Sequence, residues 1–245
     1  MRLLFDETGK RYYETGVERV VIYRLTAGRY RNGTAWNGVT AITGSGDGAE
    51  ATALYADDIK YLSLISAENW KGSIEAYNYP GVFNECLGNY EIAAGLLVGQ
   101  QNRKHFGLCF TTREGNDIKG SDFGYKLHLV YDVVAAPSDK SYQTQSDSPE
   151  PATMSWDISA GTTEVEGHKP TAEIVLDYKM MAQAGKANVM RELEDILFGT
   201  DDTSAAMPYA AEIVNIVRTG NWLMDSDGNP ITDSEGETII TQVFE

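Results

Sequence analysis

Residues Gly99–Phe110 read GQQNRKHFGLCF, and after a turn region rich in Gly, Asp and Asn the chain continues as GYKLHLVY over Gly124–Tyr131. Apolar residues alternate with others through the second segment and just beyond it. One face carries Leu127, Leu129, Tyr131 and Val133, and the other carries His128, Val130 and Asp132. This period of two is typical of a half-buried antiparallel strand. The two segments therefore predict strand, turn and strand, with no reaction centre among them.

The same period of two recurs along the rest of the chain. It is clearest in Met154–Ser159 and Ala172–Tyr178. Further strands are expected at Glu18–Tyr23, Trp36–Ile42, Lys60–Ile65, Ser73–Tyr77 and Phe106–Arg113. The 24 glycines supply turns between them. The sequence therefore predicts a mainly β fold, an antiparallel sandwich or half-barrel.

Helical spacing is rare in this chain. Asn188 fits a helix N-cap, apolar residues follow it at helical spacing, and Gly199 stands where a helix ends. We expect one flanking helix at about 188–198, laid over the sheet. A second short helix is expected over Ala210–Val217.

Three segments read as long exposed loops or extensions. Thr43–Ala51 is rich in Gly and Ser, and Pro137–Pro151 is polar with prolines at its ends. Asn221–Glu245 contains a small duplication in which each half reads as turn then strand. We therefore expect a β domain over residues 1–220 and a C-terminal extension over 221–245.

Composition narrows the classes of function. The chain has 36 Asp and Glu against 20 Lys and Arg, a formal net charge of -16, which opposes binding to nucleic acid phosphates. Its two cysteines, Cys86 and Cys109, lack metal-ligand spacing and are expected to be free thiols made in a reducing cytoplasm. No signal peptide or membrane-spanning run is expected.

We find no residue pattern in the sequence that has the spacing of a metal site or a catalytic site. Asp225, Asp227 and Asn229 begin like a calcium loop, but the twelfth position is Gly236 and not the bidentate Glu, so a hairpin turn is the better interpretation. The three histidines stand alone, and His128 is expected on a strand surface. Nucleophile-elbow, P-loop and dinucleotide motifs are absent from the sequence. We predict no catalytic, cofactor-binding or metal residues.

Two short charged groups fit subunit contacts as well as solvated turns. They are the candidate contact residues Arg103, Lys104, Asp57 and Asp58. Adjacent strand residues point to opposite faces, so the Asp57-Asp58 pair fits a turn better than a glycosidase carboxylate pair.

Six segments, in order along the chain, carry a recognisable family pattern. They are LYADDIKYL from Leu54, EAY from Glu75 with Pro80, GQQ from Gly99 with FGLC from Phe106, GYKLHLVY from Gly124, GHKPTA from Gly167, and LEDIL from Leu193 with GTD from Gly199. Together they resemble the major tail proteins of long-tailed bacteriophages. The resemblance runs from near Leu3 to about Val217.

The resemblance implies a structural protein of the virion tail, assembled in the host cytoplasm, and no enzyme. Such proteins form six-fold rings that stack into a hollow tube, and each subunit lends strands to one β-barrel that lines the lumen. DNA and the tape-measure protein pass through without specific binding. The other implied partners are the tail terminator and distal tail or baseplate proteins, with no membrane and no cofactor.

Several strands carry acids opposite their apolar residues. These candidate lumen-facing acids are Glu75, Asp132, Asp157, Glu173 and Asp177. A negative wall repels DNA over about 8–10 Å at moderate salt, whereas phosphate contacts would hold it. We hypothesise that some of the five line the lumen; the alternative is that they face outside solvent. The loops Thr43–Ala51 and Pro137–Pro151 are in turn candidate ring-to-ring contacts.

Other functions remain open at this stage. Within structural proteins they are a tail terminator, a baseplate subunit or the tube of a tail-derived bacteriocin. From another class, the 14 Tyr and 4 Trp favour a carbohydrate-binding β-sandwich, although core packing explains aromatic residues equally well. An enzyme is the remaining alternative.

Overall fold

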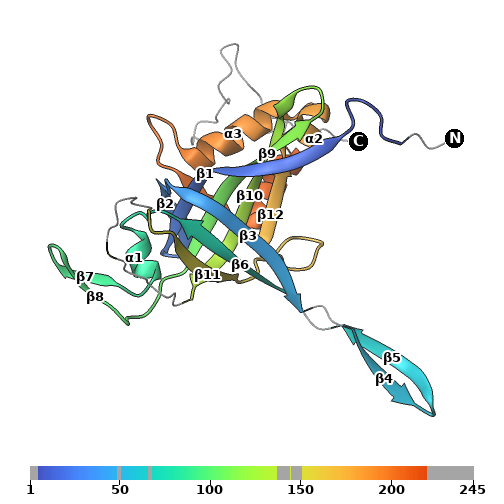
Figure 1. The fold of residues 1–245 in the computed structure, drawn as a ribbon, viewed down its shortest axis with the longest axis horizontal. Coiled ribbons are helices and arrows are strands. Elements are labelled where there is room, and N and C mark those ends of the chain that lie inside the picture. Colours follow the sequence, from blue (N-terminus) through green and yellow to red (C-terminus); the bar gives the residue numbers. More distant parts are fainter. Residues whose placement is uncertain (1–4, 49–50, 66–67, 137–143, 145–150, 220–245) are drawn as a thin grey trace.

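A computed structural model describes residues 5–48, 51–65, 68–136, 144 and 151–219, and the fold is mainly β (Figure 1). The strands of the main sheet are β1 (Tyr12–Thr26), β2 (Arg29–Ala35), β3 (Val39–Gly48), β6 (Glu68–Ala76), β9 (Phe106–Asn116), β10 (Gly120–Ala135), β11 (Met154–Ala160), β12 (Glu173–Asp177) and β13 (Ala206–Met207). Two separate hairpins are β4 (Ala51–Ala56) with β5 (Ile59–Ile65), and β7 (Tyr90–Ala93) with β8 (Leu96–Val98). The helices are α1 (Phe83–Cys86), α2 (Tyr178–Gln183), α3 (Ala187–Phe198) and α4 (Ala210–Thr219).

The main sheet has nine strands and antiparallel pairing. Its order is β13-β2-β1-β9-β10-β11-β6-β3, with β12 paired to β10 beside this path. The long strand β10 has two partners on one edge: Lys126–Val130 pairs with β12, and Val133–Ala135 pairs with β11. The sheet therefore divides at β10, and its β11-β6-β3 part turns over the β1-β9-β10 part.

A first core fills the space between these two parts of the sheet. Ile22 of β1, Phe106 of β9, Ile74 of β6 and Trp156 of β11 all belong to it and are fully or almost fully buried. The short helix α1 adds Phe83 to the same cluster. The two layers with this core between them are consistent with a β-sandwich.

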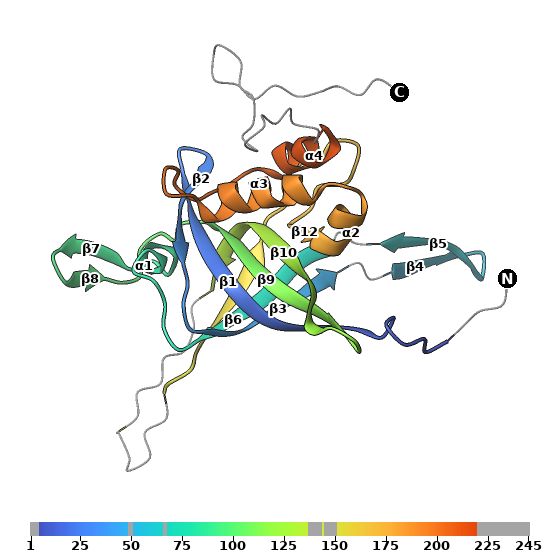
Figure 2. The same ribbon diagram turned by 90° about the horizontal axis from the view of Figure 1, so that it is seen from above.

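A second core lies on the opposite face of the β1-β9-β10 layer. Leu127, Leu129 and Tyr131 of β10 pack there against Val189 and Leu193 of α3. Residues of α2 and α4 join the same cluster, and Figure 2 shows the three helices together on one side of the sheet. Two of these helices, α3 and α4, are expected from the sequence, and α2 is an additional helix on the same apolar face.

The predicted single apolar face of Leu127–Val133 is wrong. Leu127, Leu129 and Tyr131 face the helices, but Val130 and Val133 belong to the first core. Asp132 has a φ of 49° and the register with β9 shifts between Val130 and Val133, so a bulge at Asp132 moves Val133 to the other face. The strand is thus buried on both sides.

The segment Thr43–Ala51 also differs from its prediction as a loop. Thr43–Gly48 is the second half of β3 and pairs with β6 from Ser73 to Glu68. A Cβ on Gly44 would lie 2.9 Å from the Trp70 ring, so glycine here lets the Trp70 side chain lie across the strand. The small residues of this segment therefore belong to a strand against which a neighbouring side chain packs closely, and they do not form a turn.

Most of the other predicted elements are confirmed. The strands predicted around Glu18–Tyr23, Lys60–Ile65, Phe106–Arg113 and Met154–Ser159 fall on β1, β5, β9 and β11, and the Ala210–Val217 helix falls on α4. The strand predicted at Trp36 begins later, at Val39.

The flanking helix at about 188–198 is confirmed as α3, but Asn188 is not its N-cap. The helix starts at Ala187 with Lys186 as its cap residue, directly after the turn at Gly185, which has a φ of 75°. Residues 221–245, with the calcium-like segment, and all of Pro137–Pro151 except Thr144 and Pro151 lie outside the described residues.

Candidate assembly surfaces

The outward side of the β11-β6-β3 layer is polar and made of small residues; we call it the outer face. Its residues are Ser155, Asp157 and Ser159 of β11, Lys71, Ser73 and Glu75 of β6, and Ala41, Thr43, Ser45 and Asp47 of β3. Their neighbours along β6 and β11, Ile74 and Trp156 among them, point into the first core. The alternation arises because one side of the layer is buried and the other is not.

The outer face carries a net negative charge. Glu75 and Asp157 are exposed on it, and its one cation, Lys71, forms an ion pair with Asp47 at 2.5 Å. Three acids against one base leave a net charge of -2 on this face. The Thr43 and Ser73 hydroxyls hydrogen-bond to each other at 2.8 Å, which uses these polar groups within the layer.

The other three candidate acids lie elsewhere and have partners of their own. Asp132 lies 2.6 Å from Nδ1 of His105 at the bulge of β10. Asp177 caps α2, where its carboxylate accepts a hydrogen bond from the Met180 N–H at 2.9 Å. Glu173 belongs to the polar cluster described next. The structure therefore brings together only Glu75 and Asp157 of the five.

His128 is the centre of a half-buried polar cluster. Its ring stacks on Phe110, with the centroids 4.6 Å apart, and its Nδ1 lies 2.9 Å from Glu173. The other oxygen of Glu173 accepts a hydrogen bond from the Trp70 indole N–H at 3.0 Å. The prediction of a surface His128 is wrong, because only 14% of its side chain is exposed. The cluster ties β10, β12 and β6 together where the two layers separate.

The charges of this cluster shift the pKa of its carboxylate. Burial alone raises the pKa of Glu173, but hydrogen bonds from His128 and Trp70, with the charge of His128, outweigh burial and leave the pKa below its usual range. The neighbouring Lys126 extends the cluster through Glu14 at 2.6 Å and Glu114 at 3.3 Å.

The hairpin β4-β5 projects from the body and carries the candidate contacts Asp57 and Asp58 at its tip. Both residues have positive φ, 51° and 60°, as a two-residue type I′ turn requires. The pairing of Leu54 with Leu62 and of Ala56 with Ile59 places their side chains on one face, together with Leu64. We call this aliphatic side the β4-β5 face.

The hairpin β7-β8 was not predicted from the sequence. Its signal is two short apolar runs around Ala94-Gly95. Tyr90 pairs with Val98, and Ile92 and Leu96 share their side, which we call the β7-β8 face. The candidate contacts Arg103 and Lys104 lie at the base of this hairpin. There the Tyr90 hydroxyl donates to the Asn102 carbonyl at 2.9 Å, and Lys104 pairs with Glu85 at 2.7 Å.

Two strand edges carry backbone groups free for pairing. Among the strands that the structure describes, β3 pairs with β6 alone, and the Tyr12–Arg19 part of β1 pairs with β9 alone, because the next carbonyl, that of Val20, accepts a hydrogen bond from the Trp36 N–H at 2.8 Å. Edges of this length form new sheet when a second chain supplies a strand.

The remaining findings concern cysteines, membranes and relatives. Cys86 and Cys109 are free and buried, and burial raises the pKa of each thiol to about 12. Over the described ranges, the helices are too short or too polar to cross a bilayer.

No family model matches the chain, and no curated protein matches it either.

Proposed function

We propose that this chain is a tail-tube protein, whose copies form stacked six-fold rings around a hollow lumen that conducts DNA. The observation that carries the proposal is the outer face: one side of a three-stranded layer with small polar side chains, Glu75 and Asp157 exposed, and a net charge of -2. A conduit for DNA needs a smooth wall that does not bind phosphate, and a surface of this composition meets both needs.

The open edges support the same proposal. A ring in which the outer faces form the lumen wall must continue the sheet from subunit to subunit. The free edge of β3 and the free edge of Tyr12–Arg19 in β1 provide backbone donors and acceptors for that continuation. Closure of the ring removes both edges, which otherwise favour aggregation.

Electron microscopy of the purified full chain at rising concentration tests the assembly. We expect hollow tubes of uniform width with six-fold symmetry in cross-section. A chain that stays monomeric at every concentration, or forms solid fibres, would contradict the proposal.

A charge reversal tests the role of the outer face separately. The double variant Glu75→Lys with Asp157→Lys shifts the wall by about four charge units per subunit. We expect tubes of this variant to retain a labelled DNA duplex in a salt-dependent way that native tubes do not show. The matched control, Glu164→Lys with Glu166→Lys, makes the same charge change in the exposed segment before β12. Equal retention by both variants would refute a lumen position for the outer face.

A further inference from the structure

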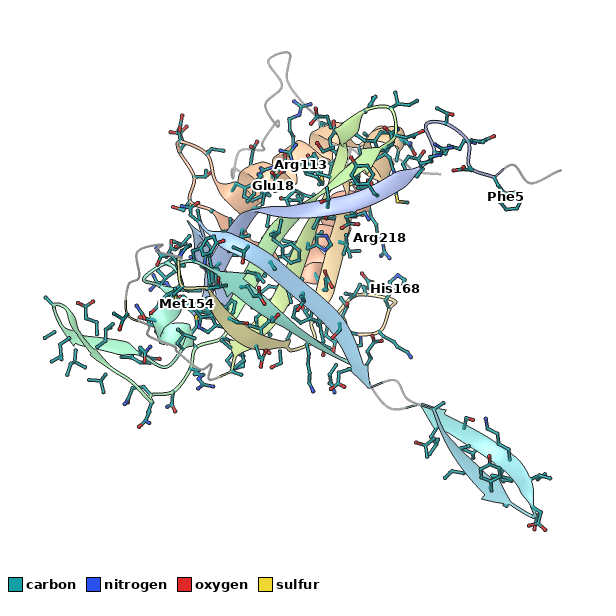
Figure 3. All side chains as sticks on the ribbon, in the orientation of Figure 1. Phe5, Glu18, Arg113, Met154, His168 and Arg218 are labelled. Carbon is teal, nitrogen blue, oxygen red and sulfur yellow. The ribbon has the colours of Figure 1, made fainter. Side chains whose placement is uncertain are left out.

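The two hairpins lie at opposite ends of the molecule. In Figures 1 and 2, which view the molecule at right angles to each other, β4-β5 and β7-β8 project from the body in opposite directions. Figure 3 shows their side chains pointing into open space on both sides of each ribbon. An isolated two-stranded hairpin is marginally stable in water, so each of these hairpins needs a partner surface.

Most of the exposed aliphatic side chains of each hairpin lie on one face, although Leu97 of β8 lies on the other. On the β4-β5 face, Ile59 is 64% exposed and Leu64 is 57% exposed. On the β7-β8 face, Ile92 is 67% exposed and Leu96 is 53% exposed. Two flat faces of this kind stack about 10 Å apart when they bury each other.

We propose that the β4-β5 face of one copy packs against the β7-β8 face of the next copy, so that the chains associate head to tail. This contact requires self-association, which the tail-tube proposal also requires, but it does not depend on the shape of the assembly. The partner is a second copy because the two complementary surfaces are on the same chain and point away from each other.

Charge complementarity fixes the direction of the overlap. Two hairpins that approach from opposite sides overlap antiparallel, so the tip of β4-β5 reaches the base of β7-β8 on the next copy. The tip carries Asp57 and Asp58, and the base carries Arg103 and Lys104. Because Lys104 already pairs with Glu85, Arg103 is the cation best placed to meet the acids of the tip.

The area of the contact sets its strength. The two faces together offer only seven large aliphatic side chains, each 36–67% exposed, so a contact between them buries only a few hundred Å². Stable interfaces need about 1,000 Å² or more. The contact alone is therefore weak and forms at high concentration or within an assembly that adds further contacts. A head-to-tail contact closes into rings or extends into filaments.

Cross-linking between two different variants tests the contact. Leu64→Cys lies near the base of β4-β5, and Ile92→Cys lies near the tip of β7-β8, so the two are adjacent in the antiparallel overlap. The native cysteines are buried and do not compete. With a short bis-maleimide, we expect dimers when the two variants are mixed at high concentration and few when either is treated alone. Ile118→Cys, an equally exposed control, should not cross-link to either variant.

Two results of the cross-linking would contradict the proposal. Dimers from one variant alone would indicate a two-fold contact between like hairpins, and no dimers in the mixture would exclude the overlap. If the mixture cross-links but electron microscopy shows no tubes, the hairpin contact stands and the tail-tube proposal is contradicted. If tubes form without cross-linking, the tail-tube proposal stands and the hairpin contact is contradicted.

A charge reversal adds an independent readout: Asp58→Lys should reduce the cross-linked fraction several-fold, and adding Arg103→Glu to the same chains should restore it.

Discussion

The sandwich core should depend heavily on one side chain that the sheet itself does not supply. Phe83 stands on the short helix α1 and is fully buried between the two layers. Its ring lies 4.5 Å from that of Trp36, 5.4 Å from that of Trp156 and 5.6 Å from that of Phe106. Phe83→Ala therefore removes the ring that these three aromatic residues share.

The size of the effect follows from these contacts. Truncation of a buried Phe to Ala costs about 3–5 kcal/mol, which includes the cavity left behind. Four tilted or edge-on aromatic contacts are lost, the fourth being with Tyr79 at 6.0 Å, so we expect the upper part of that range, about 4–5 kcal/mol. For a domain of this size, that loss lowers the melting temperature by roughly 8–20 °C.

Urea unfolding followed by tryptophan fluorescence measures this loss, because Trp36 and Trp156 report directly on the cluster. Ile118→Ala, at a site 66% exposed, is the control and should change the unfolding free energy by less than about 0.5 kcal/mol. A loss below about 1 kcal/mol for Phe83→Ala would refute the view that α1 completes the core. Phe83→Leu should recover more than half of the loss, since it refills most of the volume.

Three further predictions concern ionisation and a helix end. The lowered pKa of Glu173 gives stability that is present above its unfolded pKa and lost as the pH falls, so Glu173→Gln should flatten the acid side of a pH–stability curve measured by urea midpoints. Burial, with the nearby Asp195, raises the pKa of Glu192 to about 7. The ionised Glu192 carboxylate is therefore unfavourable in the folded state, and the stability of the fold falls as the pH rises through 7. Glu192→Gln should raise the urea midpoint more at pH 8 than at pH 5, and an equal gain at both pH values would contradict this. Gly199→Ala should lower the melting temperature by several degrees in calorimetry, because the residue has a φ of 77° at the end of α3 and its Cβ would lie 2.8 Å from a backbone oxygen; an unchanged value would be inconsistent with that geometry.

The sequence predicts the strands of this fold well because one physical signal dominates. Wherever one face of a strand is buried, apolar residues alternate, and β11 shows this in full: Trp156 and Ile158 are buried while Asp157 is exposed. The signal weakens where both faces are buried, as in β10. It fails at Asp132, because the bulge depends on tertiary pairing and the residue has an ordinary strand neighbourhood in the sequence.

Composition misleads in a different way at β3. Gly44 and Gly46 read as a flexible loop, yet a glycine also serves a strand that must admit a neighbouring side chain, and only the position of Trp70 distinguishes the two cases. The partition of the five acids could not be predicted for the same reason. Glu75 and Glu173 have similar sequence surroundings, and only the fold leaves one on an open face and places the other against His128.

The two partners of β10 have a mechanical consequence. This strand is hydrogen-bonded to β12 over one part of an edge and to β11 over the next, with β9 along its other edge. Among the described strands, the pairing of β10 with β11 is therefore the hydrogen-bonded link between the helix-covered layer and the β11-β6-β3 layer. The two layers should therefore open together, as one cooperative unit, and not one after the other.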